Sequence, residues 1–396
     1  MKTIIHHIEL SHTSPNISGG ETAMLEIIRY LNRSSDFFQY VYTSESGMQV
    51  YRKLLGRDAE RIIFIVIGKK WVERISEYMA YYLRIIEQLF YLRKFSNNSK
   101  NVILSHEGFL PTSIHSFLLK KINKQAKWLA FFHMKSPSIW KGFEGEYMGK
   151  YQFPSLRMIR YKLEEWFFLK LARKNVAKLI TVNPCYADFI NKACGSCYVF
   201  KFFGGDCACG ARMNRNASHK YDLSFMGRFH EQKGVSEIVD ILKKLKVSKP
   251  DISLVLIGGG VKRIEDKFFE LVKKEDLEEN ITYLGYVTGD ERYSILAQSK
   301  VFLFPSHYES FGLVALEAMQ CGLPVVAYDL PPFQVFEKGM LKIPISNNQK
   351  MTREILKLLE DAEYYAKIKT EAIDFSANFS WEKTGEEIKQ LIEAII

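Results

Sequence analysis

The sequence lacks any apolar run that approaches the roughly 18 to 20 residues needed to cross a bilayer, which excludes a conventional transmembrane helix. It also lacks a clear secretory signal. The first residues, MKTIIHHIEL, hold one Lys and a short apolar stretch interrupted by His6, His7 and Glu9, which favours a first β-strand instead. No internal repeat or low-complexity segment is evident. We therefore expect a globular, cytoplasmic protein, and the hydrophobic content of 47% agrees with a packed core.

Acidic residues are scarce in the first half of the chain. Residues 1–200 hold 29 Lys and Arg against 16 Asp and Glu, a net charge of +13, whereas residues 201–396 hold 26 against 29, a net charge of −3. The first half is also rich in aromatic residues. This asymmetry indicates an anionic partner for one domain only: membrane lipid, a phosphorylated acceptor or nucleic acid.

Cysteines are few, and five of the six lie between positions 185 and 209. Cys194, Cys197, Cys207 and Cys209 have a spacing that suggests zinc. However, residues 198–203 read as a strand about 20 Å long, which would separate Cys197 from Cys207. Tetrahedral zinc needs all four sulfurs about 2.3 Å from one point. We predict ordinary reduced cysteines and no metal.

Two further signatures are missing. Gly258, Gly259 and Gly260 lack the third glycine of a dinucleotide-binding fingerprint at the required spacing, so a tight β–α turn is the better interpretation. No Asp-x-Asp pair follows a strand, which agrees with chemistry that requires no cofactor or metal.

What is present is an alternation of short apolar runs and helical stretches, typical of parallel α/β layers. We predict two Rossmann-like α/β/α domains with a ligand in the cleft between them. Predicted strands are 2–10, 61–67, 101–106, 127–133, 178–183, 198–203, 221–227, 251–258, 281–285, 301–305 and 324–328. Predicted helices are 20–32, 234–247, 261–274, 290–298, 312–320 and several within 351–394. The predicted segments are an N-terminal Rossmann-like domain at 1–205, a linker at 206–220, a C-terminal Rossmann-like domain at 221–376 and a last helix at 377–396.

Two basic, aromatic helices are predicted in the first half, at 71–94 and 156–174. Basic amphipathic helices with Trp and Phe lie in membrane interfaces. The same pattern also suits a core-facing helix with a solvated basic face. The sequence leaves both readings open, and with them a peripheral position on the inner face of a membrane.

The strongest motif is Glu309-Ser-Phe-Gly-Leu-Val-Ala-Leu-Glu317, which follows an apolar strand and opens a helix. A helix N-terminus favours phosphate, and Gly312 lets phosphate approach the backbone. If helical, the eight-residue offset corresponds to about 12 Å. Glycosidase carboxylates lie only about 5 to 9.5 Å apart. The two carboxylates therefore suit a nucleotide sugar better than a hydrolase site.

A second motif, Gly227-Arg-Phe-His-Glu-Gln-Lys-Gly234, joins a strand to a helix. Its cations, Arg228 and Lys233, are of the kind that bind diphosphate oxygens and stabilise a departing nucleotide.

Together with LVLIGGG, YLGYV and CGLPVVA, these motifs resemble the retaining glycosyltransferases of the GT-B fold, glycosyltransferase family 4 (glycosyl transferases group 1). The resemblance covers most of 221–335 and, more loosely, the whole chain. It implies sugar transfer from a nucleoside diphosphate, with uridine favoured by family frequency alone, to a glycan or lipid-linked hydroxyl in cell-surface glycan assembly. It implies catalytic roles for Glu309, Arg228, Lys233 and His133. It implies donor binding by Gly20, Gly227, Ser310, Phe311, Gly312, Leu313, Glu317 and Val287.

The resemblance extends to Gly19-Gly20-Glu21, to Gly204-Gly205-Asp206 and to the terminal FSWEKTGEEIKQLI. It implies that the domain at 1–205 binds the acceptor, that the domain at 221–376 binds the nucleotide sugar, and that the helix at 377–396 crosses back to pack on the first domain. It is interrupted after CGLPVVA, where YDLPPFQVF replaces the usual glycines and glutamate, so the donor sugar near Asp329 stays open. Two alternatives remain: an epimerase or phosphorylase on the same scaffold, and a basic nucleic-acid-binding protein, for which no recognised motif is present.

Overall fold

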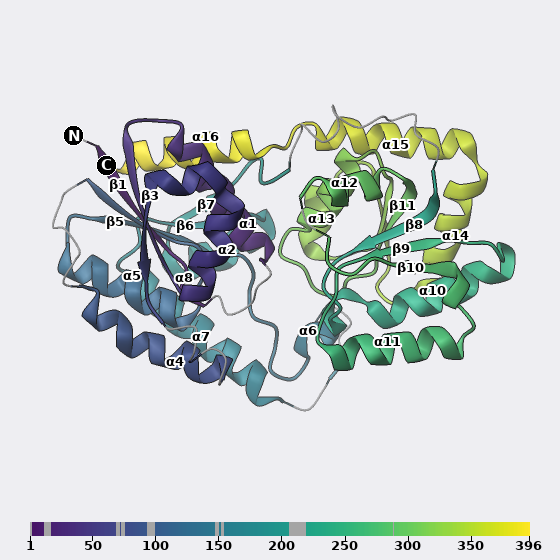
Figure 1. Cartoon of the computed structure of the whole chain (residues 1–396), viewed down its shortest axis with the longest axis horizontal. Coiled ribbons are helices and arrows are strands. Elements are labelled where there is room, and N and C mark those ends of the chain that lie inside the picture. Colours follow the sequence, from purple (N-terminus) through teal and green to yellow (C-terminus); the bar gives the residue numbers. More distant parts are fainter. Residues whose placement is uncertain are drawn as a thin grey trace. The chain divides into compact units, whose positions relative to one another are not determined.

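The computed structural model describes residues 2–11, 17–68, 72, 76–92, 100–146, 150–151, 154–205, 219–287 and 289–396 (Figure 1). The chain divides into two compact units. The first comprises Met1–Ser136, Ser155–Phe203 and Trp381–Ile396, and the second comprises Pro137–Pro154 and Gly204–Ser380. Each unit holds one parallel sheet. The predicted architecture of two α/β domains is confirmed.

The sheet of the first unit has seven strands in the order β3-β2-β1-β4-β5-β6-β7. Its inner strands are largely buried on both faces, which explains their almost continuous apolar runs, whereas the two edge strands are only partly buried. The strands are β1 (Thr3–Ile8), β2 (Phe37–Thr43), β3 (Ile62–Val66), β4 (Asn101–Ser105), β5 (Lys127–Phe131), β6 (Lys178–Thr181) and β7 (Cys197–Val199). The helices are α1 (Gly19–Asn32), α2 (Glu45–Leu55), α4 (Glu77–Glu87), α5 (Leu110–Ile122), α7 (Leu156–Ala172), α8 (Ala187–Cys194) and α16 (Trp381–Ile395). Figure 1 shows α4, α5 and α7 on one face of this sheet and α16 on the other.

The sheet of the second unit has six strands in the order β10-β9-β8-β11-β12-β13. The strands are β8 (Tyr221–Met226), β9 (Leu254–Ile257), β10 (Ile281–Tyr283), β11 (Ser299–Phe304), β12 (Val325–Tyr328) and β13 (Met340–Ile343). The helices are α6 (Gly142–Gly145), α10 (Val235–Ser248), α11 (Lys262–Lys274), α12 (Glu291–Leu296), α13 (Leu313–Gln320), α14 (Asn348–Glu360) and α15 (Ala362–Ser376). An apolar core of this unit joins α10, α11 and α14 to the inner strands.

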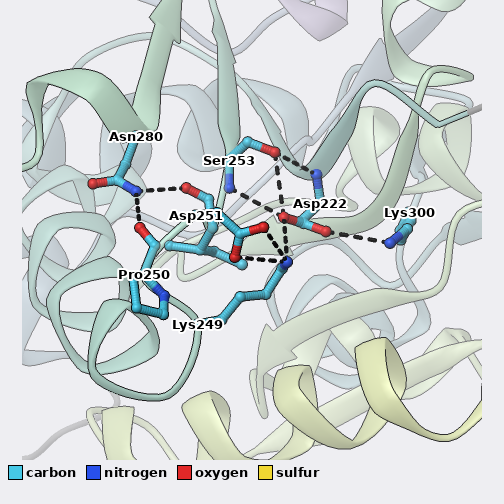
Figure 2. Close-up of polar contacts among 8 residues, drawn as sticks. Asp222, Lys249, Pro250, Asp251, Ser253, Asn280 and Lys300 are labelled. Carbon is cyan, nitrogen blue, oxygen red and sulfur yellow. Dashed lines mark hydrogen bonds and ion pairs between the residues drawn. The ribbon is translucent and has the colours of Figure 1, made fainter.

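A polar network ties the amino ends of four strands of this second sheet together (Figure 2). Asp222 of β8 is 7% exposed, and its carboxylate accepts hydrogen bonds from the backbone and hydroxyl of Ser253. Lys300 of β11 lies 3.3 Å and Lys249 lies 3.8 Å from the same carboxylate. Asn280, which precedes β10, donates to the carbonyls of Pro250 and Ile252. This edge is therefore stabilised internally, and the opposite, carboxyl edge carries the loops with the motifs.

The last helix, α16, follows the second unit in sequence but belongs to the first. It packs against α1 so closely that a Cβ at Gly385 would lie 2.2 Å from Cγ of Tyr30. The Tyr30 hydroxyl donates to Glu386, and the Glu387 carboxylate accepts from the backbone N–H groups of Lys201 and Phe202.

The elements differ from the predictions in several places. Sequence reasoning missed β2, α2, α5, α6, α8 and β13. The predicted strand at 198–203 is only the three residues of β7, so the predicted 20 Å separation of Cys197 from Cys207 loses its basis. Cys207, Cys209, Asp206 and most of the predicted linker lie outside the described residues.

One segment groups with a different unit from the one we assigned on sequence. Pro137–Pro154 belongs to the second unit. The reason is local packing, since the ring of Phe143 lies 5.2 Å from that of Tyr308 in an edge-to-face contact.

Candidate functional site

Three loops at the carboxyl edge of the second sheet are pressed together at glycines. A Cβ at Gly258, whose φ is +121°, would lie 2.1 Å from the carbonyl oxygen of Gly227. A Cβ at Gly260 would lie 2.3 Å from the carbonyl oxygen of Phe229. The interpretation of 258–260 as a tight turn agrees with this geometry. The close approach fixes the loop that starts at Gly227 and carries Arg228 and Lys233.

Lys233 is positioned by the short turn that precedes α10. Gly234 ends this turn with φ +67°, and a Cβ there would lie 2.0 Å from the carbonyl oxygen of Pro305. Only glycine satisfies both requirements. The amide of Gln232 donates to the carbonyl of Tyr308 at 2.5 Å, and the N–H of His307 donates to the carbonyl of Gln232 at 2.8 Å. The turn is thus bonded to the loop that follows β11.

The same two loops bring together two of the predicted catalytic side chains. Nζ of Lys233 lies 2.5 Å from Oε1 of Glu309. Both side chains are largely buried, at 15% and 8% exposure. Removing one partner of a buried ion pair leaves the other charge buried without compensation, which strongly destabilises the protein. Lys233 and Glu309 therefore hold one another in place. The pair is a cation and a carboxylate at the carboxyl edge of a parallel sheet, where α/β folds bind ligands.

The helix of the strongest motif, α13, begins at Leu313, after Gly312 in a left-handed conformation with φ +95°. We predicted a start at 312. The first turn is marked by bonds from the N–H groups of Ala315 and Leu316 to the carbonyl of Gly312. The N–H groups of Leu313 and Val314 are therefore at the helix N-terminus, which favours an anion. Since Glu309 precedes the helix, the 12 Å offset predicted for a fully helical segment does not apply.

Glu317 is 6% exposed on α13 and is held by two residues that sequence reasoning missed. The guanidinium of Arg292 lies 2.9 Å and the hydroxyl of Tyr293 lies 3.0 Å from its Oε1. Arg292 also stacks over the ring of Tyr293 at 4.5 Å. Both come from α12, and no sequence motif marked them, because only the fold brings α12 beside α13.

The remaining predicted donor residues line the same edge of the sheet. Arg228 is exposed. Burial raises the pKa of Tyr286, and the positive charge of Arg228 partly opposes this shift. Val287, the residue after Tyr286, is half-buried. Phe311 is buried and Ser310 half-buried in the loop before α13.

In the first unit the structure brings Gly20 and His133 together. A Cβ at Gly20 would lie 3.0 Å from Nε2 of His133. That nitrogen lies 2.7 Å from the carbonyl oxygen of His106, so it carries the proton and donates. Burial lowers the pKa of His133, and the hydrogen bond to His106 partly opposes the shift. His133 is therefore neutral at pH 7 with a defined tautomer.

A buried acidic group lies at the carboxyl ends of β1 and β4 and was not predicted. The pKa of Glu107 is raised well above its ordinary value, first by burial and then by the charge of Glu9. Thr112 donates to Glu107 at 2.6 Å, and Tyr51 donates to Glu9 at 2.5 Å. Glu107 therefore takes up a proton more readily than an exposed carboxylate.

Among the residues that the structure describes, no three His, Cys, Asp or Glu side chains are grouped so that they could hold a metal ion. Within the same ranges, no helix is both long and apolar enough to cross a membrane.

Residues 212–375 match the family model described as "Glycosyl transferases group 1". Curated relatives match over parts of the chain. An uncharacterized glycosyltransferase of Methanocaldococcus jannaschii is 25% identical over 241 residues, covering 60% of this chain and 65% of that protein. The O-antigen chain mannosyltransferase B of Escherichia coli is 28% identical over 171 residues, covering 41% of this chain and 45% of that protein. Each of these relatives is matched over less than two thirds of its own length.

Solved structures match the whole chain. HepE of Anabaena, in complex with UDP and glucose, superposes with a TM-score of 0.74 at 14% identity and covers 99% of this chain and 100% of HepE. Sucrose-phosphate synthase of Thermosynechococcus elongatus has a TM-score of 0.75 at 19% identity and covers 100% and 99%. At these identities the likeness concerns the fold.

The two parallel-sheet units thus form the GT-B fold shared with solved glycosyltransferases. Within that fold, residues 212–375 match the model of the glycosyl transferases group 1 family. The predicted fold class is confirmed, and the match of residues 212–375 bears out the predicted resemblance to glycosyl transferases group 1. The roles of the individual site residues stay predictions.

Proposed function

We propose that the protein is a glycosyltransferase that moves a sugar from a nucleoside diphosphate to a hydroxyl of a glycan or lipid-linked acceptor. The observation that carries this proposal is the site after β8 and β11. There the Lys233–Glu309 pair and the N-terminus of α13 lie on loops bonded to one another. A cation and a helix N-terminus suit a diphosphate, and a carboxylate suits sugar hydroxyls. Two proteins of similar fold support this donor class: HepE of Anabaena in complex with UDP and glucose, and the pneumococcal O-GlcNAc transferase GtfA in complex with UDP and GlcNAc.

The proposed reaction proceeds with retention and needs no metal. The bond between the anomeric carbon and the diphosphate oxygen breaks, and its electron pair leaves with the nucleotide. The acceptor oxygen bonds to the same face of the anomeric carbon, and its proton passes to a phosphate oxygen of the leaving group. Arg228, Lys233 and the α13 N-terminus stabilise the charge that develops on the diphosphate. Each donor of this kind lowers the activation free energy by about 2.7 to 4 kcal/mol.

The donor residues divide between the two ends of the nucleotide sugar in this proposal. Glu309 contacts the sugar, and Glu317, held by Arg292 and Tyr293, contacts the ribose. His133, neutral and fixed by the His106 carbonyl, acts near the reacting sugar. We favour UDP as the nucleotide and a lipid-linked acceptor at a membrane surface, in assembly of a cell-surface polysaccharide or glycolipid.

A thermal-shift screen of nucleoside diphosphates and their sugars identifies the donor, since a selective ligand stabilises the native state. Release of nucleotide is then measured with that donor. Lys233→Ala and Glu309→Ala are expected to lower turnover at least about a hundredfold, because each removes a contact made at the reacting diphosphate or sugar.

Lys244→Ala provides the matched control, because Lys244 pairs with Asp240 on the surface of α10. Its turnover is expected to remain near that of the unaltered protein. Near-normal turnover in both site variants would refute the proposed function. EDTA is expected to leave the rate unchanged, and an acceptor-linked sugar with free nucleotide as products excludes an epimerase or phosphorylase.

A further inference from the structure

Helix α4 and the turn that follows it expose apolar side chains where a surface helix normally exposes charge. Within 76–92, leaving Glu77 aside, every exposed side chain is apolar or Tyr. The exposed fractions reach 65% for Tyr78 and 75% for Phe90. Arg84, by contrast, is completely buried and donates to the carbonyl of Leu10. The exposed set is Tyr78, Met79, Tyr82, Leu83, Ile86, Leu89 and Phe90.

Helix α7 carries a second exposed apolar row. Leu156, Ile159, Leu163 and Trp166 recur every three or four residues, which places them along one side of the helix. Leu156 is 86% exposed and Trp166 is 58% exposed.

The two helices are neighbours on the same face of the first sheet (Figure 1). The hydroxyl of Tyr81 on α4 donates to Glu164 on α7 at 2.9 Å. The guanidinium of Arg160 on α7 lies over the ring of Tyr78 at 5.4 Å. We call the seven exposed residues of 78–90 and the four of α7 the α4–α7 surface.

The charges of α7 are sorted by sign, and Glu87 of α4 is half-buried. The acidic residues of α7 are turned inward or paired: Glu164 is 3% exposed, and Glu165 lies 3.0 Å from Lys162. The exposed charged side chains of α7 and the two residues after it are all basic, namely Arg157, Lys170, Arg173 and Lys174. A surface of this kind is complementary to anionic headgroups above an apolar layer.

We propose that the α4–α7 surface docks onto an anionic phospholipid membrane, with its apolar residues in the interface and its basic residues among the headgroups. Trp and Tyr prefer this interfacial depth, and Lys and Arg near it gain attraction to anionic lipid. The surface belongs to the unit in which we place acceptor binding. It would hold that unit at the membrane, where a lipid-linked acceptor lies. Only this last step rests on the proposed function, because membrane binding is measured without sugar transfer.

Sedimentation of the full chain with vesicles tests the proposal. One set contains phosphatidylcholine alone and the other equal amounts of phosphatidylcholine and phosphatidylglycerol, at about 0.05 M and about 0.5 M salt. We expect binding to the anionic vesicles at low salt and weaker binding at high salt. The double variant Phe90→Ser/Trp166→Ser should lower the vesicle partition coefficient at least tenfold, and Lys170→Glu should lower it less. Nucleotide release from a soluble donor should be unchanged in all of them.

Val247→Ser is the matched control, since Val247 is 84% exposed on α10 in the second unit. It should bind vesicles like the unaltered protein. Absence of sedimentation with anionic vesicles at low salt would overturn the proposal, as would equal loss in the control. A dimer in analytical ultracentrifugation that dissociates in Phe90→Ser/Trp166→Ser, without vesicle binding, would instead assign the surface to a second copy of the chain.

Discussion

At the residue scale, the site is built from charges that hold one another. Lys233 and Glu309 were predicted separately, one for the diphosphate and one for the sugar. The structure pairs them at 2.5 Å within a largely buried environment. In the proposed reaction, the bound donor therefore either separates Lys233 from Glu309 or contacts both while they remain paired. Recognition of the phosphate is thereby coupled to recognition of the sugar.

The contact between Arg292 and Glu317 gives a prediction at this scale. Arg292→Ala removes the cation 2.9 Å from the Glu317 carboxylate and leaves the Tyr293 hydroxyl. Hydrogen bonds to charged groups contribute about 1.5 to 3 kcal/mol, so we expect nucleoside diphosphate to bind at least about tenfold more weakly. Isothermal titration calorimetry measures this loss.

A deoxyribose analogue distinguishes positioning of Glu317 from a general loss of structure. If Glu317 binds the ribose hydroxyls, the penalty of Arg292→Ala should shrink for the deoxyribose nucleotide, and Arg292→Lys should restore part of the affinity. Arg263→Ala, on the exposed side of α11, is the control. An equal penalty for both nucleotides would contradict the positioning role.

At the element scale, close packing decides where helices can lie. Gly385 lets α16 reach α1, because a Cβ there would lie 2.2 Å from Cγ of Tyr30. Gly385→Ala would favour an isolated helix by up to about 1 kcal/mol. We nevertheless expect the overpacked interface to lower the free energy of unfolding by about 1 to 3 kcal/mol. Urea unfolding followed by circular dichroism measures the sign.

Gln390→Ala, on the exposed side of the same helix, should change the free energy of unfolding by no more than about 0.5 kcal/mol. The double variant Gly385→Ala/Tyr30→Ala removes the clash and should recover part of the loss. A stabilised Gly385→Ala protein would show that α16 does not pack as closely as the structure indicates.

At the scale of the whole molecule, the first unit buries four histidines in and around its sheet, and this sets its response to pH. Burial lowers the pKa of His6 to about 4 and those of His7 and His115 to about 3, and the pKa of His106 is lowered well below its ordinary value. The unfolded chain therefore binds more protons below about pH 6.5. The four histidines therefore cost the folded state nothing above that pH, where they are neutral in both states. The free energy of unfolding decreases as the pH falls toward 4.

Glu107 and Glu164 act in the opposite direction, because burial raises the pKa of each carboxyl and lets the native state hold a proton above pH 4.5. These two groups are outweighed by four histidines. We expect the urea midpoint to fall steadily from pH 6.5 to about pH 4. The slope of the free energy of unfolding against pH reports how many more protons the unfolded chain binds. His115→Leu should reduce this slope by roughly one proton, or about 1.4 kcal/mol per pH unit. A midpoint that stays constant or rises on acidification would contradict this account.

Local patterns predicted most of the helices and strands that flank the site. The strands before Gly227 and before Pro305 are continuous apolar runs, and α10 has apolar residues at helical spacing. In contrast, β2 was missed because FFQYVYT follows a polar turn without a clear boundary, and β13 because MLKI is short. The predicted helix at 71–94 is described as helix only at Val72 and from Glu77 to Glu87, and its remaining residues lie partly outside the described ranges.

The sequence by itself determined the class of fold and the two motif loops, because apolar periodicity, glycine positions and residue order are local properties of a chain, and the order of those motifs carried the resemblance to glycosyl transferases group 1. Only the tertiary structure decided which side chains meet. Lys233 meets Glu309 and Arg292 meets Glu317 across 76 and 25 positions of sequence. It also decided that the exposed rows of α4 and α7 are apolar, since the pattern of an amphipathic helix is the same whichever side faces the core. Burial fixes that choice, and burial depends on what the rest of the chain packs against the helix.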